Sequence, residues 1–99
     1  EIRIMPKKHQ PYFEEDENTK DFAEALKISL EKIYKGLNNV AYNFFIHTPP
    51  ADRNNEYEYY HWHLEINPRT TTWGGFELGT GGDVISVDPD EAAEYFRGV

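Results

Sequence analysis

The sequence predicts a small α+β domain with a mostly antiparallel sheet, and three observations lead to this fold class. Residues 20–37 repeat apolar side chains at the three- and four-residue spacing of a helix. Residues 2–5, 42–48 and 59–66 have the composition of strands, and a proline soon follows each of them. Two of these strands are close neighbours in the chain, so we expect a hairpin-linked pair crossed by one long helix.

The long helix is expected to begin near Lys20 and to end near Leu37. Asn18 or Thr19 can cap its first turn, where the carboxylate of Asp21 also suits the helix dipole. The apolar stripe consists of Phe22, Leu26, Leu30, Ile33 and Leu37. A helix with one such stripe is expected to pack that stripe against the sheet.

The end of the chain is expected to hold glycine-rich turns, a short strand and a short helix. Five of the nine residues 74–82 are glycines, which favour tight turns or a close approach of the backbone to a ligand. Residues 84–87 predict the short strand. Asp88 and Pro89 suit the N-cap and first position of a final helix, which Phe96 would pack. The expected order of elements is therefore β-α-β-β-β-α.

Composition excludes several classes of function. The net charge of −8 comes with no cluster of basic residues, whereas a nucleic-acid-binding surface needs a positive stripe. The apolar runs are too short to span a membrane and no signal peptide is visible, so we expect a cytoplasmic domain. Because the chain has no cysteine, its own metal ligands must be His, Asp or Glu. A chain of 99 residues that starts at Glu1 without an initiator Met predicts one domain of a longer polypeptide.

The His-Trp-His run inside the third strand is the strongest candidate for a functional site. Side chains alternate across a strand, so residues two apart share a face. One face of residues 59–66 should carry a polar row made of Tyr59, His61, His63 and Glu65. The opposite face should carry a core row made of Tyr60, Trp62, Leu64 and Ile66. The polar row can hold a metal ion or place a nucleophile beside a helper.

The chain offers four histidines, which are His9, His47, His61 and His63. With a carboxylate such as Glu65 they supply ligand types that zinc and ferrous iron accept. The alternative, an ordinary hydrogen-bonded histidine, is favoured for any one His alone, and for the pair His61 and His63 the two interpretations are balanced. His63 can also act as a nucleophile toward phosphorus if a neighbour fixes its tautomer.

Arg69 and the glycine-rich stretch are candidate contacts for a phosphorylated sugar. The stretch can surround a phosphate with backbone N–H groups, although it lacks the spacing of a P-loop or a dinucleotide fingerprint. Arg69 can bind a phosphate through two parallel bonds. Glu77 can bind sugar hydroxyls while the ring of Phe76 packs on the sugar. Each candidate has a structural alternative. The glycine-rich stretch can be a tight loop, Arg69 can form a surface ion pair, and Glu77 can be a solvated residue beside a core Phe76.

Five stretches together resemble the C-terminal domain of the galactose-1-phosphate uridylyltransferases. Residues 60–69 read Tyr-His-Trp-His-Leu-Glu-Ile-Asn-Pro-Arg, residues 75–81 read Gly-Phe-Glu-Leu-Gly-Thr-Gly, and residues 89–93 read Pro-Asp-Glu-Ala-Ala. Residues 4–9 (Ile-Met-Pro-Lys-Lys-His) and 42–48 (Tyr-Asn-Phe-Phe-Ile-His-Thr) match in the same order. The resemblance covers nearly the whole chain, and no single stretch is unique by itself.

This family belongs to the histidine-triad superfamily, so the resemblance implies one histidine-triad-like domain over residues 1–99, the C-terminal half of a longer two-domain enzyme. The family transfers UMP between UDP-glucose and galactose 1-phosphate through a uridylylated histidine. That histidine lies in a His-Pro-His-Gln motif of the N-terminal domain, which residues 1–99 do not contain. The implied enzyme is a homodimer that binds a nucleotide sugar and a hexose 1-phosphate, and residues 1–99 alone are expected to be inactive.

The resemblance also implies a structural zinc or iron ion with His61 as a ligand. In some members the other ligands match His9 and an upstream Cys-x-x-Cys pair. In others they match His47 and His63, with a Glu from the other domain. The sequence leaves both sets open.

Phe76 and Glu77 match positions that contact the hexose in this family. Glu65 stands where the third His of a histidine triad would be, which argues against an independent triad hydrolase. Three alternatives stay open: an ADP-glucose phosphorylase-like nucleotidyltransferase, a histidine-triad hydrolase that uses His63, and a non-catalytic metal-binding module.

Overall fold

The structure is a computed structural model, and it describes residues 1–50, 57–70, 75–82 and 87–99. Its elements in chain order are β1 (Ile2–Ile4), the 3-10 helix η1 (Phe13–Glu15), α1 (Thr19–Gly36), β2 (Tyr42–His47), β3 (His63–Pro68), α2 (Gly75–Thr80) and α3 (Pro89–Arg97). The strand predicted at residues 84–87 lies almost entirely outside the described residues. The long helix and the first two strands agree with the predicted bounds to within about one residue.

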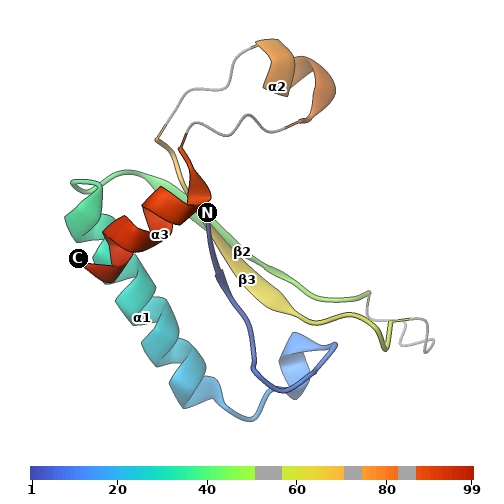
Figure 1. Cartoon of the computed structure of the whole chain (residues 1–99). Helices are drawn as coiled ribbons and strands as arrows, with labels where there is room; N and C mark the ends of the chain where they lie inside the picture. The colour runs from blue at the N-terminus through green and yellow to red at the C-terminus, as the bar shows by residue number, and fades with distance from the viewer. Residues whose placement is uncertain (51–56, 71–74, 83–86) are drawn as a thin grey trace.

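The three strands form an antiparallel sheet in the order β1-β3-β2, as Figure 1 shows. In the register, Ile4 lies opposite Leu64, and Phe44 lies opposite Ile66. At one end of the β2–β3 pair, His47 lies opposite His63. The predicted α+β class, the antiparallel sheet and the pairing of the second and third strands are confirmed.

The third strand begins four residues later than predicted. The backbone N–H of Trp62 donates to the carbonyl of Gln10 at 3.1 Å instead of joining the sheet, and the N–H of Tyr60 closes a turn onto the Tyr57 carbonyl at 2.9 Å. The prediction of strand for residues 59–62 is therefore wrong. The segment before His63 follows the loop after β1 and only then enters the sheet.

The hydrophobic core lies between α1 and one face of the sheet. Ile33 of α1 and Leu64 and Ile66 of β3 are almost completely buried. The other stripe residues pack against them, as predicted: Phe22, Leu26, Leu30 and Leu37. Each buried aliphatic side chain of this size contributes about 1.5–3 kcal/mol relative to an exposed one. These contacts hold the helix on the sheet and so fix the orientation of β3.

An aromatic cluster continues the core toward the N-terminal end of α1. The buried indole of Trp62 meets the ring of Phe13 edge-on, with centroids 4.9 Å apart, and the ring of Phe22 at 5.6 Å. Its Nε1–H donates to the side-chain oxygen of Gln10 at 3.1 Å, so the polar edge of the indole is satisfied. Trp62 thereby anchors the segment that carries the two neighbouring histidines.

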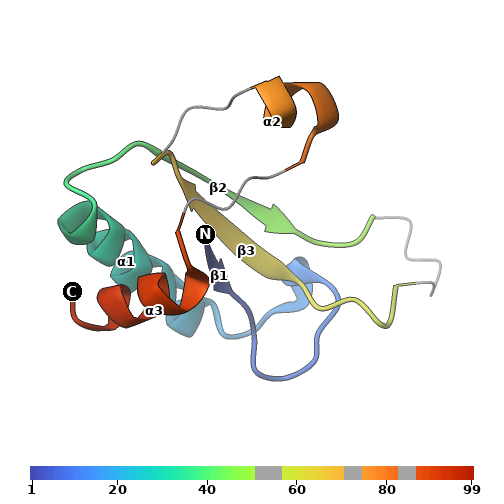
Figure 2. The same ribbon diagram turned by 45° about the horizontal axis from the view of Figure 1, so that its top comes forward.

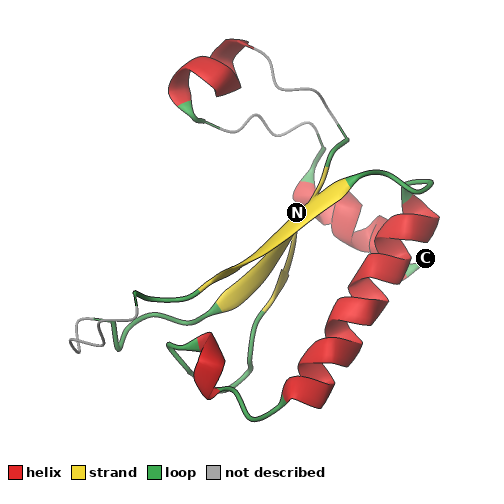
Figure 3. Ribbon diagram, turned by 180° about the vertical axis from the view of Figure 1, so that it is seen from behind, coloured by secondary structure: helices red, strands yellow, loops and turns green. Residues whose placement is uncertain are grey.

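The C-terminal helix α3 packs beside the end of α1, which Figures 1 and 3 show from opposite sides. Asp88 caps it as predicted, because its carboxylate accepts the N–H of Asp90 at 2.8 Å. Two bonds join the helices: Tyr95 Oη donates to the Gly36 carbonyl at 2.7 Å, and Lys32 Nζ donates to the Phe96 carbonyl at 2.7 Å. The lysine supplies a positive charge at the negative end of the α3 dipole.

Part of the glycine-rich stretch forms the helix α2, not the turns that the glycine content predicted. This short helix stands apart from the sheet and from the other helices, as Figure 2 shows. Thr80 Oγ1 donates to the Phe76 carbonyl at 2.7 Å and accepts the N–H of Gly82 at 3.1 Å. Gly81, with φ of 73°, provides the left-handed residue that ends the helix. Among the described residues, no helix combines the length and apolarity that crossing a membrane requires.

Candidate functional site

The structure separates the four histidines into two pairs. His63 begins β3 and stacks on His47 of β2, with ring centroids 4.9 Å apart. His61 lies before the strand, and its ring meets His9 edge-on at 5.6 Å. The prediction of one strand row through Tyr59, His61 and His63 is thus wrong, because the regular alternation of a strand starts only at His63.

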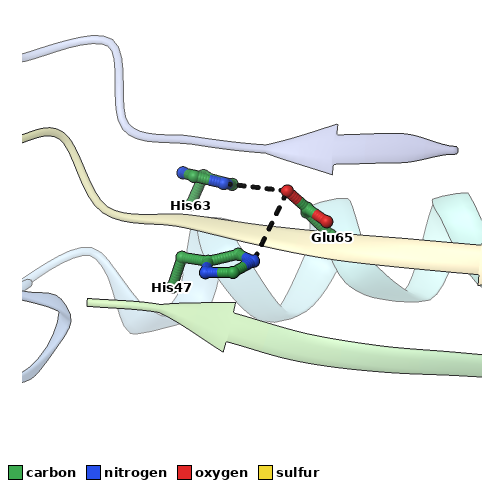
Figure 4. Close-up of side chains that lie close together, drawn as sticks. All are labelled: His47, His63 and Glu65. Carbon is green, nitrogen blue, oxygen red and sulfur yellow. Dashed lines mark hydrogen bonds and ion pairs between the residues drawn. The ribbon is translucent and has the colours of Figure 1, made fainter. Parts of the chain in front are cut away.

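Glu65 completes the first pair as a group of three possible metal ligands, which Figure 4 shows on the side of the sheet away from α1. Its Oε1 lies 3.1 Å from His63 Nε2 and 3.5 Å from His47 Nε2. All three possible ligand atoms lie within 4.8 Å of one another. Two ligands of a tetrahedral zinc ion, with bonds of about 2.0–2.1 Å, lie about 3.3 Å apart. The donor types and spacing therefore fit a small divalent cation.

This group of His47, His63 and Glu65, hereafter the strand triad, is partly buried. The side chains of Glu65 and His63 are 12% and 19% exposed, whereas that of His47 is 44% exposed. The buried carboxylate is compensated by charge, because Arg3 Nη2 lies 3.5 Å from its Oε1. A hydrogen bond from Arg3 to Glu1, and then the charges of Glu1 and Glu65, raise the pKa of the Arg3 guanidinium.

The second pair, His9 and His61, is positioned by backbone carbonyls. Nε2 of His9 lies 2.6 Å from the carbonyl oxygen of Glu58, and Nε2 of His61 lies 2.7 Å from that of Pro6. A carbonyl only accepts, so each Nε2 is the hydrogen-bond donor, and Nδ1 is the ring nitrogen that could bind a metal. Histidines that ligate metals commonly donate their other ring nitrogen to a carbonyl in this way. This pair offers two ligands and needs others to form a complete site.

The residues predicted to contact substrate lie at the other end of β3. Arg69 directly follows the strand and is exposed, and Phe76, in α2, is 59% exposed. Glu77 is the next residue of α2. His63 and Pro68 are five residue steps apart along the strand, a distance of about 17 Å. The structure therefore does not bring the predicted sugar contacts together with the histidines.

Two members of the site environment were not predicted from the sequence. Arg3 reaches Glu65 only because β1 pairs with β3 in a register that places these residues opposite each other. Tyr60, predicted to face the core, instead stacks near His63 with centroids 6.4 Å apart. Knowledge of the strand pairing would have identified Arg3, whereas the place of Tyr60 depends on the turn at residues 57–60.

Comparison with known proteins gives close relatives. The chain is 40% identical, over its whole length, to an ADP-glucose phosphorylase of Arabidopsis thaliana. A crystal structure of an ADP-glucose phosphorylase from this plant, with bound ADP-glucose, superimposes on 98% of the chain with a TM-score of 0.89 and 39% identity. The X-ray structure of a GalT-like protein from the same plant gives a TM-score of 0.90 over 98% of the chain, again with 39% identity. No family model matches.

Fold, sequence and paired histidines define a histidine-triad-like α+β domain. More particularly, the chain is similar over nearly its whole length to an ADP-glucose phosphorylase and to a GalT-like protein, in agreement with the resemblance of its motifs. It spans 29% of the length of the curated relative and about a third of each solved chain. The activity of the whole protein is therefore a matter for proposal.

Proposed function

We propose that residues 1–99 serve as the C-terminal, non-nucleophilic domain of a cytoplasmic enzyme that transfers nucleotidyl groups of nucleotide sugars. One observation carries the proposal: a solved ADP-glucose phosphorylase with bound ADP-glucose matches 98% of the chain at 39% identity. Residues 1–99 contain no His-Pro-His-Gln motif, so the nucleophile is assigned to another part of a longer polypeptide. In this scheme the domain supplies a structural metal site and contacts to the sugar phosphate.

Two specificities are candidates. The motifs of the sequence favour a UDP-glucose:hexose-1-phosphate uridylyltransferase, whereas the relatives favour phosphorolysis of ADP-glucose. In both, a histidine nitrogen attacks the nucleotidyl phosphorus and the bond to the sugar phosphate breaks, which releases glucose 1-phosphate. The nucleotidyl group then passes to galactose 1-phosphate in the first case and to inorganic phosphate in the second. The products are UDP-galactose or ADP.

The decisive experiment gives the full-length polypeptide each nucleotide sugar, labelled at the phosphate next to the nucleoside. We expect a covalent nucleotidyl–protein adduct with one of the two sugars, discharged by the matching acceptor. Residues 1–99 alone should form no adduct. An adduct on residues 1–99 that disappears in His63→Ala would instead establish His63 as the nucleophile. Metal uptake without any nucleotide-sugar binding by the full-length polypeptide would favour a non-catalytic module.

For the metal, we propose the strand triad as the site that residues 1–99 can form alone, with zinc as the ion and iron as the alternative. Two imidazoles and a carboxylate at the observed spacing suit either ion. A bound ion would join β2 to β3 and neutralise the carboxylate, which is a structural role. The pair of His9 and His61 is proposed as half of a second site, completed by two ligands from outside residues 1–99.

Metal analysis after dialysis against zinc tests this assignment. Residues 1–99 should retain about one ion, and His63→Ala and Glu65→Gln should both abolish retention. His61→Ala is the matched control within the same run, and it should leave retention unchanged. Loss of the ion in His61→Ala but not in Glu65→Gln would show that His9 and His61 form the binding pair and would overturn the assignment to the strand triad.

For the substrate, we propose that Phe76 and Glu77 contact the hexose and that Arg69 contacts a phosphate. The supporting observations are the exposure of Phe76 and Arg69 and their separation from the metal ligands. In the full-length enzyme, Phe76→Ala should raise KM for the sugar substrate about tenfold, which corresponds to the roughly 1.4 kcal/mol of a modest stacking contact. Leu78→Ala, which removes another exposed side chain of α2, is the control and should leave KM unchanged.

A further inference from the structure

Arg3 places a permanent positive charge beside the strand triad, and the proposed metal site does not use it as a ligand. The register of β1 and β3 sets Arg3 directly opposite Glu65, so the two side chains share one face of the sheet. Arg3 Nη2 lies 3.5 Å from Glu65 Oε1. The imidazoles of His63 and His47 approach the same oxygen, at 3.1 and 3.5 Å, as Figure 4 shows. The oxygen that a metal ion would use is therefore also the oxygen that Arg3 contacts.

The guanidinium of Arg3 also has a second carboxylate within reach, that of Glu1. Its Nε donates to Glu1 Oε2 while its Nη2 faces Glu65. The side chain of Arg3 is about half exposed, whereas that of Glu65 is largely buried. Arg3 can therefore move away from Glu65 and keep both water and Glu1 as partners. Glu65 has no such freedom and needs a positive charge beside it.

We propose that Arg3 is the counter-ion of Glu65 in the metal-free chain, and that a divalent cation replaces it there while the guanidinium moves to Glu1. Arg3 thereby sets the affinity of the strand triad for its ion. A dication held by one carboxylate and two neutral imidazoles is repelled by a guanidinium a few ångströms away. The same guanidinium competes with the ion for Oε1 of Glu65. The inference rests on the strand triad as the metal site proposed above.

This exchange of counter-ions predicts opposite effects of one substitution. Without zinc, Arg3→Gln should be less stable than the unchanged chain, because Glu65 has lost its counter-charge. Zinc should bind to Arg3→Gln about tenfold more tightly, because the repulsion and the competition have been removed. A residue with a merely structural role would lower both the stability and the affinity for zinc. Thermal unfolding without zinc and calorimetric titration with zinc measure the two quantities.

Two further variants separate the charge of Arg3 from its shape and from the net charge of the chain. Arg3→Lys keeps the positive charge, so its dissociation constant for zinc should stay close to that of the unchanged chain. Arg97→Gln removes the same charge from an exposed position of α3 and should leave the dissociation constant unchanged. Because Arg3 is half exposed, the difference between Arg3→Gln and the unchanged chain should shrink as the salt concentration rises. A difference that is independent of salt would contradict an electrostatic role.

A double-mutant cycle with Glu1 tests where the guanidinium moves. Glu1→Gln removes the second carboxylate, so Arg3 should stay on Glu65 and zinc should bind less tightly. In the Arg3→Gln background the same change at Glu1 should have a clearly smaller effect, and the difference is the coupling between the two residues. Equal effects in both backgrounds would overturn the exchange with Glu1.

His63→Ala distinguishes a failure of this inference from a failure of the metal assignment. Zinc binding that survives His63→Ala would overturn both, because the strand triad would not be the site. Zinc binding that requires His63 but is unchanged or weaker in Arg3→Gln would overturn the role of Arg3 alone. Tighter zinc binding in Arg3→Gln, together with lower stability in the absence of zinc, is the expected result.

Discussion

Neighbouring residues of β3 face opposite environments, and this alternation decides what each can do. Ile66 has no exposed surface and lies in the core, whereas the carboxylate of Glu65 on the other face meets His63, His47 and Arg3. The strand triad therefore has a rigid support, because the core fixes the backbone from which Glu65 projects. A change to the core row should affect stability, and a change to the polar row should affect ligation.

Ile66→Ala should be among the most destabilising single substitutions in this chain. It removes a completely buried side chain and leaves a cavity beneath the strand triad, with an expected cost of about 2–5 kcal/mol in the free energy of unfolding. Ile28→Ala, at a position of α1 that is 45% exposed, should cost less than about 1 kcal/mol and serves as the control. Urea denaturation of the three proteins measures the difference, and equal midpoints would contradict the assigned core.

At the scale of elements, the two helix caps differ in chemistry although the sequence suggested both. The side chain of Asp88 accepts the N–H of Asp90, but the side chain of Asn18 makes no capping bond at the start of α1. Asp88→Ala should therefore cost about 1 kcal/mol. Asn18→Ala should lower the stability clearly less. Thermal unfolding of the two variants therefore compares the caps directly. A larger loss in Asn18→Ala would show that α1 is capped by that side chain after all.

Gly36 allows α3 to lie close against α1. A Cβ atom at this position would lie 3.2 Å from ring carbons of both Tyr95 and Phe96, so these rings would have to move. In Gly36→Ala we expect overpacking to lower the free energy of unfolding by about 1–3 kcal/mol. The better helix propensity of alanine offsets about 1 kcal/mol of this cost. At Gly75 a Cβ meets nothing within 4 Å, so Gly75→Ala should be neutral or stabilising. Comparison of unfolding temperatures checks both, and a stable Gly36→Ala would contradict the close packing.

The helix stripe and the Asp88 cap could be predicted from sequence because their signals are local. Spacing alone identified Phe22 to Leu37 as one face, and the structure confirms it. The start of β3 could not be predicted, because the pattern of residues 59–62 is strand-like while their hydrogen bonds go to the distant Gln10 and to a turn. The pairing of the histidines could not be predicted for the same reason: which histidine lies beside which depends on strand register, and register is a property of two segments.

The glycine-rich stretch shows the opposite error. Its glycine content is a local signal that predicted turns, but the structure has a helix there. Glycine is a weak helix former, yet residues 75–80 are helical. Phe76, Glu77, Leu78 and Thr80 supply side chains between the glycines, and the Thr80 bond to the Phe76 carbonyl supports the turn. The helix also places Phe76 and Glu77, the predicted sugar contacts, at neighbouring positions of one element.

At the scale of the whole molecule, a metal bound to the strand triad would join two strands of a small sheet. The ion could bind in this way only to the folded state. Unfolding separates His47 from His63, so an ion that requires both should stabilise the native chain by mass action. At a free zinc concentration a hundredfold above Kd this amounts to about 2.7 kcal/mol. For a chain of this size such a gain raises Tm by on the order of 10 °C. Calorimetry with and without zinc measures the shift, and a chelator should reverse it.

The same calorimetric measurements show which histidine pair binds zinc, because the variants differ in the zinc-dependent rise in Tm. No assay of activity is needed. His63→Ala should lose the zinc-dependent rise in Tm, because it removes one of three ligands from the strand triad. His9→Ala should keep the rise, because His9 and His61 provide only two ligands among the described residues and bind an ion weakly. Measuring each variant against its own zinc-free baseline removes the cost of the substitution itself. A rise that persists in His63→Ala and disappears in His9→Ala would move the metal to the pair that the backbone carbonyls of Pro6 and Glu58 position.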